Sequence, residues 1–276
     1  KKFRQYSRKA WRAGNDMNEI VHKPVLLREV IEYLNLKSGM NIIDATLDGG
    51  GYAVAILEKI LPGKLLGIEL DGKLLEETKL RIKNAGFGGN VILINDNYVN
   101  LKKIAEENNF QPDGIVFDLG LSSWHLEKSE RGFSFKRNEI LDMRFNPETQ
   151  ALTAAEIVNR YGAEDLKKII SENGEEQFAE NIAEAIVKAR KSEPIIKTQD
   201  LVNIISFAVP EWYKHRKIHF ATKTFQALRI EVNDEFENIR KGVLAAIDIL
   251  KSGGRLAVVS FHGLEDKIVK EIFKNK

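Results

Sequence analysis

The sequence predicts an α/β fold with a mainly parallel sheet that is interrupted by a helical insert. Short apolar runs end in acidic or polar residues, and segments with apolar residues at helical spacing separate them. This alternation stops between residues 127 and 216, where only helical patterns occur, and a last apolar run follows near residue 255. Strand, helix and strand at this spacing indicate parallel strands joined by right-handed crossovers.

Five apolar runs are predicted to be strands: Met40–Asp44, Lys64–Glu69, Val91–Asn95, Gly114–Asp118 and Arg255–Ser260. Helices are predicted between the first four, at Tyr52–Ile60, Lys73–Asn84 and Leu101–Asn108. Residues 1–126 and 217–276 should therefore form one discontinuous α/β domain.

The insert, residues 127–216, is predicted to contain four helices: Thr153–Arg160, Ala163–Ser171, Glu175–Lys191 and Thr198–Ala208. Thr153 and Thr198 are expected to be N-caps, the first with Glu156 in a capping box. A single long helix is predicted after the insert, at Phe225–Leu250.

Composition limits the function. The 276 residues include no cysteine, which excludes disulfides, thiolate metal sites and a cysteine nucleophile. The five histidines are spread along the chain, so we expect no metal. No apolar stretch is long enough to span a bilayer and no secretory signal opens the chain, so we expect a cytoplasmic protein.

The net charge is only +2, so a nucleic-acid partner has to be argued from local patches. Six cations precede the first acid, Asp16, and form a solvated tail, a phosphate-contacting arm or the remnant of a targeting peptide: Lys1, Lys2, Arg4, Arg8, Lys9 and Arg12.

The segment from Asp44 to Tyr52 contains a glycine-rich loop between a strand and a helix. Glu69 ends the second strand, where an acid can accept both ribose hydroxyls of a nucleoside. The loop has neither G-x-G-x-x-G nor G-K-[ST] spacing, and Asp44 and Asp48 would repel phosphates. Both acids would tolerate the sulfonium and amino group of S-adenosylmethionine. This ligand is therefore favoured over a dinucleotide, and a structural turn without a ligand is the other alternative.

Several ordered blocks carry a family resemblance. They read H-K-P-V-L-L, D-L-G-L-S-S, E-R-G-F-S-F, L-D-M-R, T-F-Q-A-L-R-I and S-F-H-G-L-E-D, beginning at His22, Asp118, Glu130, Leu141, Thr224 and Ser260. From His22 to Lys270 the sequence resembles the RsmH (MraW) family of bacterial small-subunit rRNA N4-cytosine methyltransferases.

The resemblance implies a class I S-adenosylmethionine-dependent methyltransferase, with a Rossmann-like sheet and a helical insert that recognises RNA. It further implies methylation of N4 of one cytidine in the decoding centre of 16S rRNA. Matching positions imply that the cofactor-binding residues are Gly50, Gly51, Tyr52, Glu69, Tyr98, Asp118 and His125.

The chain also departs from the family pattern. Asp48 stands where the family usually has glycine, and it adds a charge to the loop. Four other residues differ from those common in the family but mostly keep the same kind of side chain, an acid for an acid or an aromatic for an aromatic: Tyr52, Glu69, Tyr98 and His125. Gly263 stands where the family has serine. The family's arginine-rich segment after the S-F-H block would lie beyond Lys276, so we expect a last strand and some RNA contacts to be missing.

Methylation of N4 needs acceptors beside an amine whose lone pair is delocalised into the ring. Asp118, Ser122 and Ser123 end or follow the fourth strand, and they are the first candidates for catalysis. Asp142 is a second carboxylate candidate, with a salt bridge to Arg144 or Arg131 as the alternative.

Arginines and lysines alternate with Phe133, Phe135 and Phe145, a pattern that suits phosphate contact and base stacking or a solvated rim around an aromatic core. His262 contacts the substrate or is a satisfied turn histidine. The RNA-binding candidates are Arg131, Arg144, Arg229 and His262.

Three functions follow from these patterns. The leading one is a 16S rRNA methyltransferase that acts on the small ribosomal subunit. The second is a catalytically weakened ribosome-binding assembly factor on the same fold. The third is an NAD-dependent oxidoreductase, which the missing dinucleotide spacing disfavours. The sequence leaves open whether the chain is a monomer or a homodimer.

Overall fold

The computed structural model describes residues 24–276. The basic run at the start of the chain, with His22 and Lys23, lies outside the described residues. The chain divides into two compact units. Unit 1 comprises the described residues up to Ser123 together with Gly242–Phe261. Unit 2 comprises Trp124–Lys241 and His262–Lys276.

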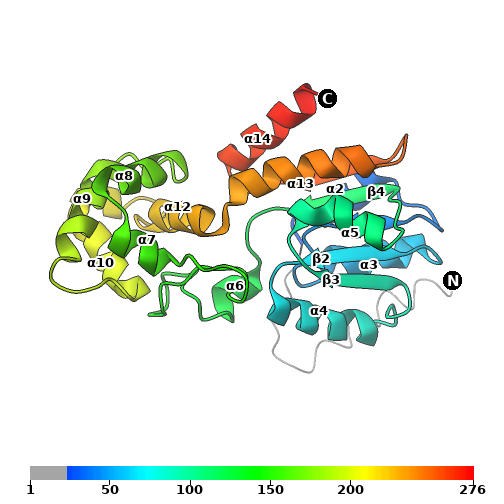
Figure 1. The fold of residues 1–276 in the computed structure, drawn as a ribbon, viewed down its shortest axis with the longest axis horizontal. Helices are drawn as coiled ribbons and strands as arrows, with labels where there is room; N and C mark the ends of the chain where they lie inside the picture. Colours follow the sequence, from blue (N-terminus) through cyan, green and yellow to red (C-terminus); the bar gives the residue numbers. More distant parts are fainter. Residues whose placement is uncertain (1–23) are drawn as a thin grey trace. The chain divides into compact units, whose positions relative to one another are not determined.

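Unit 1 is built on a parallel five-stranded sheet in the order β3-β2-β1-β4-β5 (Figure 1). The expected α/β class is confirmed, and each predicted strand forms with its end within two residues of its predicted bounds. The strands are β1 (Ile42–Asp44), β2 (Leu65–Glu69), β3 (Val91–Asn95), β4 (Gly114–Asp118) and β5 (Arg255–Val259). All neighbours pair in parallel, so the connections run as crossovers and not as hairpins.

Helices cover both faces of this sheet. On one face, α2 (Leu27–Leu34), α3 (Gly51–Ile60) and α4 (Gly72–Asn84) contribute to a buried core with strand residues such as Ile42 and Val116. On the other, the Tyr98 ring meets Phe117 edge-on at 5.5 Å, and Gly242 lies so close to Tyr98 that a Cβ would approach within 2.5 Å. The short helices η1 (Tyr98–Asn100) and α5 (Leu101–Glu107) follow β3. The sheet is therefore buried as a parallel sheet requires.

Unit 2 is helical apart from one isolated bridge between Ile140 and Lys197. Helices α8, α9 and α10 pack in sequence, and α12 packs on α7 and α8. The helices after β4 are α6 (Ser123–Glu127), α7 (Ala154–Arg160), α8 (Ala163–Glu172), α9 (Ala179–Ala189), α10 (Thr198–Ala208), α11 (Glu211–Lys214), α12 (Thr222–Asn233), α13 (Glu235–Ile249) and α14 (Gly263–Lys274). Unit 2 thus includes α12 and α14, which we had expected in the α/β domain, and the division falls within α13.

Several helix predictions need correction. The expected long helix Phe225–Leu250 is two helices, because Asp234 takes a left-handed φ of 49° between them. The helix expected from Glu175 begins at Ala179, since Glu175 is also left-handed. Thr198 is the first helical residue and not the N-cap. The Thr153–Glu156 capping box is confirmed. Among residues 24–276, four α-helices and the short helix η1 were not predicted; the α-helices are α2, α6, α11 and α14.

Within residues 24–276, no helix is long and apolar enough to cross a membrane. The same residues contain no group of three or more histidine, aspartate or glutamate side chains that could hold a metal ion.

Candidate functional site

Acidic residues gather at the carboxyl ends of the central strands of unit 1. Asp44 ends β1, Glu69 ends β2 and Asp118 ends β4. Strand β1 lies between β2 and β4, so the chain reverses its direction of winding between β1 and β4. Ligands of open parallel sheets bind at such a switch point, outside the carboxyl ends of the strands.

The loop after β1 is held in a tight conformation by α4. Asp48 and Gly50 take left-handed φ values of 46° and 73°. The Thr78 hydroxyl donates to the Asp48 carbonyl at 2.6 Å, and the Arg81 guanidinium donates to the Gly49 carbonyl. A Cβ on Gly50 would approach Thr78 Cγ2 within 2.8 Å, so this position needs glycine for both its φ and its space.

Glu69 fixes the backbone on two sides of the site. Its Oε2 accepts from the Asp48 N–H at 2.9 Å, and its Oε1 accepts from the Asp71 N–H at 2.8 Å. Burial raises the pKa of Glu69 to about 7, although the Asp71 N–H opposes the rise. A carboxylate oxygen has two lone pairs, so both oxygens can still accept from a ligand hydroxyl.

Asp44 and Asp48 lie close to other carboxylates. Asp44 is fully buried, and neither of its oxygens has a hydrogen-bond partner in the described part of the chain. Burial and, next, the Asp118 carboxylate raise its pKa well above the usual value, while the nearby Thr46 N–H lowers it without completing a hydrogen bond. The pKa of Asp48 is raised by burial and then by Glu69 and Asp118.

This donor set suits a cationic ligand. Among residues 24–276, Asp44, Asp48 and Glu69 form no salt bridge, so no described cation offsets their burial. A pyrophosphate would be repelled, whereas a sulfonium and an ammonium group would offset the carboxylates. The residues present therefore fit S-adenosylmethionine, and the contact of Glu69 with the ribose hydroxyls stays a prediction.

The other residues expected to bind the cofactor are distributed over both units. Gly51 begins α3 beside the loop. Tyr52 is buried and donates its hydroxyl to the Val25 carbonyl, and burial raises its pKa. Tyr98 follows β3 and packs on Phe117. His125 belongs to unit 2, where its ring packs among those of Trp124, Phe133 and Phe145. Its expected contact with the cofactor stays a prediction.

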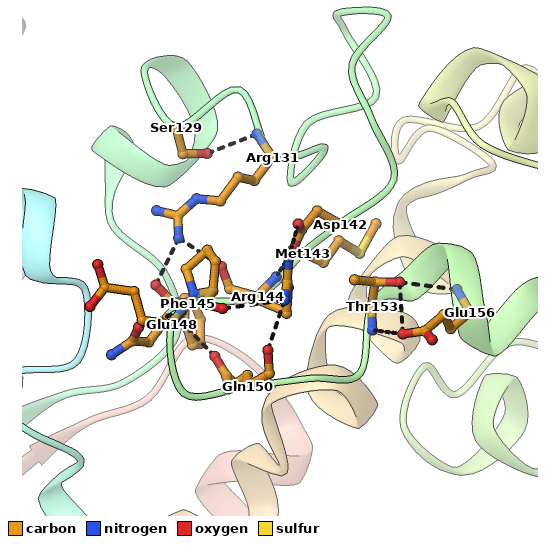
Figure 2. A network of polar contacts seen from close by, with 12 residues as sticks. Ser129, Arg131, Asp142, Met143, Arg144, Phe145, Glu148, Gln150, Thr153 and Glu156 are labelled. Carbon is orange, nitrogen blue, oxygen red and sulfur yellow. Dashed lines mark hydrogen bonds and ion pairs between the residues drawn. The ribbon is translucent and has the colours of Figure 1, made fainter.

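The catalytic candidates also divide between the units. Asp118 is 5% exposed, and its N–H donates to Thr46 Oγ1 at 2.6 Å. Ser122 is buried in the following loop, and Ser123 is the last residue of that part of unit 1. Asp142 lies in unit 2 and forms the alternative salt bridge to Arg144 that the sequence left open, with Nη2–Oδ2 at 2.7 Å and Nε–Oδ1 at 2.8 Å (Figure 2).

The arginines that we expected to bind RNA make internal contacts in unit 2. Arg131 Nη1 donates to the carbonyls of Arg144 and Phe145 at 2.9 and 2.8 Å, and Arg144 Nη1 donates to the Gln150 carbonyl at 2.8 Å (Figure 2). Arg229 binds both oxygens of Glu235, at 2.7 and 2.9 Å. These bonds use much of each guanidinium, and RNA contact by these residues stays a prediction.

His262 precedes α14, where its backbone N–H donates to Glu265 Oε2 at 3.3 Å. Its Nε2 lies 3.1 Å from Glu265 Oε1, close enough for an ion pair if the ring is protonated, but outside hydrogen-bond geometry. Its expected contact with the substrate stays a prediction.

Asp44 is the site residue that the sequence analysis did not select. We used it to argue against phosphate, but not as a ligand-binding residue. The sequence did contain a signal for Asp44, because this acid is the last residue of the predicted, buried first strand. A carboxylate buried there without a partner is costly, which indicates a ligand.

Together these features define a class I, Rossmann-like α/β protein with a site for a cationic nucleoside. The profile of the MraW methylase family matches residues 19–276, so the chain belongs to this family. It is a methyltransferase whose cofactor is S-adenosylmethionine.

Three relatives are each named "Ribosomal RNA small subunit methyltransferase H". The protein of Persephonella marina is 44% identical over 93% of this chain and 87% of its own length. The protein of Dictyoglomus thermophilum is 44% identical over 93% of this chain and 85% of its own length. That of Dehalococcoides mccartyi is 45% identical over 94% and 73%.

Proposed function

We propose that this chain transfers the methyl group of S-adenosylmethionine to N4 of a cytidine in 16S rRNA, at the decoding centre of the small ribosomal subunit. The names of its relatives support the rRNA substrate. The acid cluster at the switch point supports a cationic methyl donor. The place of action is then the cytoplasm, where small subunits are assembled.

Unit 1 supplies the cofactor site, with Gly50, Gly51 and Glu69 around the nucleoside. S-adenosylmethionine, when bound, supplies a methyl group that its sulfonium has already activated. The protein's main contribution is therefore to hold the amine in line with that methyl group.

The acceptors for the N4 amine come from the end of β4. Asp118 and the following Ser122 and Ser123 can accept hydrogen bonds from the amine, which localises its lone pair on nitrogen. A carboxylate in the same place stabilises the positive charge that develops there during transfer. Asp142 is a weaker candidate, because Arg144 already binds both of its oxygens.

The test uses small ribosomal subunits from a strain that lacks its own N4 methyltransferase. Purified protein and S-adenosylmethionine are added, and the rRNA nucleosides are identified by mass spectrometry. We expect N4-methylcytidine with the wild type and none with Asp118→Asn, while S-adenosylmethionine binding survives in that variant. A different methylated nucleoside would overturn the N4 assignment.

The same experiment separates the enzyme from an assembly factor. A protein that binds subunits but transfers no methyl group would support the assembly-factor alternative, and Asp48 in the cofactor loop would then be the first residue to examine.

A further inference from the structure

Three cations of unit 2 are exposed and lie apart from the internally bonded arginines. Lys136, Arg216 and Lys217 are exposed, and none of them forms a salt bridge with a described residue. Arg131, Arg144 and Arg229, in contrast, donate to carbonyls or carboxylates of the same unit. Lys136 belongs to the basic–aromatic pattern of the sequence, whereas Arg216 and Lys217 are exposed cations that the sequence did not single out.

Two loops that are distant in sequence carry these cations and meet at a ring stack. The Phe135 ring stacks on the His219 ring, with centroids 4.5 Å apart and planes within 15°. Phe135 also meets Phe225 of α12 edge-on at 5.4 Å, which anchors the stack to the helical core. Lys136 follows Phe135 directly, and Lys217 precedes His219 by two residues.

An exposed tryptophan lies beside the cations. Trp212 is 59% exposed, and its edge packs on Tyr213 and Phe178, with centroids 5.7 and 5.9 Å apart. The Arg216 guanidinium lies over the same Tyr213 ring, 5.4 Å from its centroid. Tyr213 is buried and donates its hydroxyl to Glu176 at 2.7 Å, so Trp212 and Arg216 share a fixed support.

The acids nearest in sequence already have partners. Glu211 pairs with Lys214 at 2.8 Å and lies 3.2 Å from His215. Glu139 accepts from the Gly132 N–H at 2.9 Å, and Glu176 accepts from Tyr213. Of these three acids only Glu211 is exposed, and it is paired with a lysine, so the exposed unpaired charges beside Trp212 and Phe135 are positive.

We propose that Lys136, Trp212, Arg216, Lys217 and His219 form a basic–aromatic face that binds an unpaired strand of rRNA. Unpaired cations suit phosphates, and an exposed flat ring suits a base that is not already stacked in a duplex. The His219 ring already stacks on Phe135 and on Phe220, with centroids 4.5 and 4.2 Å apart, so it supports the face and leaves base stacking to Trp212. The inference rests on the proposed rRNA substrate and names the part of unit 2 that contacts it.

The experiment measures binding of the full chain to protein-free small-subunit rRNA and to whole small subunits over a range of salt concentrations. Arg216→Ala/Lys217→Ala is compared with Lys188→Ala/Lys191→Ala, which removes the same charge from exposed positions at the end of α9. We expect the salt slope to fall by about 1.4 only in the first variant, since each phosphate contact to a single strand contributes about 0.7.

Trp212→Leu tests stacking separately from charge. It keeps an apolar side chain against Phe178 but loses the flat ring. We expect rRNA affinity to fall about 5- to 100-fold with an unchanged salt slope. S-adenosylmethionine binding, measured by calorimetry in every variant, should equal that of the wild type, and an unchanged far-UV circular dichroism spectrum and urea midpoint show that the helical unit 2 is intact.

The outcomes distinguish this inference from the proposed function. If the wild type methylates rRNA and the Arg216/Lys217 variant binds rRNA with an unchanged salt slope, the basic–aromatic face is wrong although the function stands. If the variant loses binding to whole subunits but not to protein-free rRNA, the face binds a ribosomal protein and the inference is wrong. If the wild type binds rRNA through this face but methylates no nucleoside, the inference stands and the proposed function fails.

Discussion

Both units bury carboxylates, and two of those in unit 2 are paired with arginines, whereas the acids clustered in unit 1 have no described arginine or lysine partner. In unit 2, Glu235 is 6% exposed and receives two hydrogen bonds from Arg229. Asp142 likewise receives two from the Arg144 side chain. In unit 1, Asp44, Asp48 and Glu69 are clustered and form no salt bridge with a described residue.

The difference separates a structural use of buried charge from a functional one. A buried carboxylate is costly unless it is paired or hydrogen-bonded. Burial raises the pKa of Glu235 too, but Arg229 opposes that rise, whereas the neighbours of Asp44 and Asp48 mostly increase it. Unit 1 keeps acids whose missing counter-charge a cationic ligand can provide.

Breaking a pair in unit 2 gives the largest expected effect on stability. Arg229→Ala leaves Glu235 buried without its partner, and the free energy of unfolding should fall by about 3–5 kcal/mol. Urea denaturation followed by circular dichroism measures this change. The double variant Arg229→Met/Glu235→Leu removes both charges and should recover most of the loss.

The contrary outcome for Arg229 is informative. If Arg229→Ala is as stable as the wild type but binds rRNA less well, then the arginine serves the RNA, as the sequence suggested, and the contrast between the units is weaker than we describe.

Removing an acid from unit 1 should affect the ligand more than the fold. Glu69→Ala removes both acceptors for the ribose hydroxyls and should raise the dissociation constant of S-adenosylmethionine about 10- to 100-fold. Glu69 also holds the N–H groups of Asp48 and Asp71, so part of this loss comes from the loop. Glu69→Gln keeps the shape and should lose less.

Calorimetry with S-adenosylmethionine on the folded variants decides this point. If Glu69→Ala binds as tightly as the wild type, Glu69 does not hold the ribose and our placement of the cofactor is wrong.

Local patterns predicted the sheet well because its central strands β1, β2 and β4 are buried on both faces, and all five strands read as apolar runs. The long helix Phe225–Leu250 was wrong because apolar spacing continues across Asp234, whose left-handed conformation breaks the helix. An aspartate after Asn233 is a weaker sequence signal for the end of a helix than a glycine or a proline would be.

Three acids of the site, Asp44, Glu69 and Asp118, were accessible to the sequence because each ends a predicted strand, although only Glu69 and Asp118 were selected. The partners of Arg131, Arg144 and Arg229 were harder to predict, because a basic residue beside aromatics reads equally as an RNA contact or as an internal donor. Only tertiary contacts such as the Arg131 bonds to backbone carbonyls distinguish the two. The stack of Phe135 on His219 joins segments far apart in sequence and gave no local signal.

The charge state of unit 1 should make its stability depend on pH. The pKa of Glu69 is about 7 in the folded chain, above its usual 4.5. Between pH 4.5 and pH 7, Glu69 is therefore mostly protonated in the folded state and mostly ionised in the unfolded state. The free energy of unfolding without ligand should therefore fall as the pH rises from 4.5 to 7, by on the order of 1–3 kcal/mol. Urea denaturation across this range measures the fall, and Glu69→Gln should flatten it.

Ligand binding should show the opposite trend. A cation prefers the ionised carboxylates, so the affinity for S-adenosylmethionine should rise over the same pH range. S-adenosylhomocysteine has the same groups but a neutral sulfur, and its affinity should rise less. Equal pH dependence for both ligands would mean that the acids do not respond to the sulfonium.

Asp48 gives the smallest expected effect, and it combines backbone strain with charge. Its φ of 46° lies in the left-handed region, which glycine adopts at little cost and aspartate at a modest one. Its carboxylate also lies near Glu69, Asp118 and Asp44.

Asp48→Gly removes the strain and the charge and should stabilise the ligand-free protein by about 1 kcal/mol. Asp48→Asn removes only the charge, because asparagine tolerates the same φ, so the difference between the two variants in urea denaturation isolates the backbone contribution. We also expect Asp48→Gly to tighten S-adenosylmethionine binding, since the closer approach that a glycine allows should outweigh the loss of one of the clustered carboxylates. If both variants instead bind the cofactor more weakly, Asp48 pairs with the ammonium group of the ligand, and the acid that departs from the family pattern belongs to the binding site.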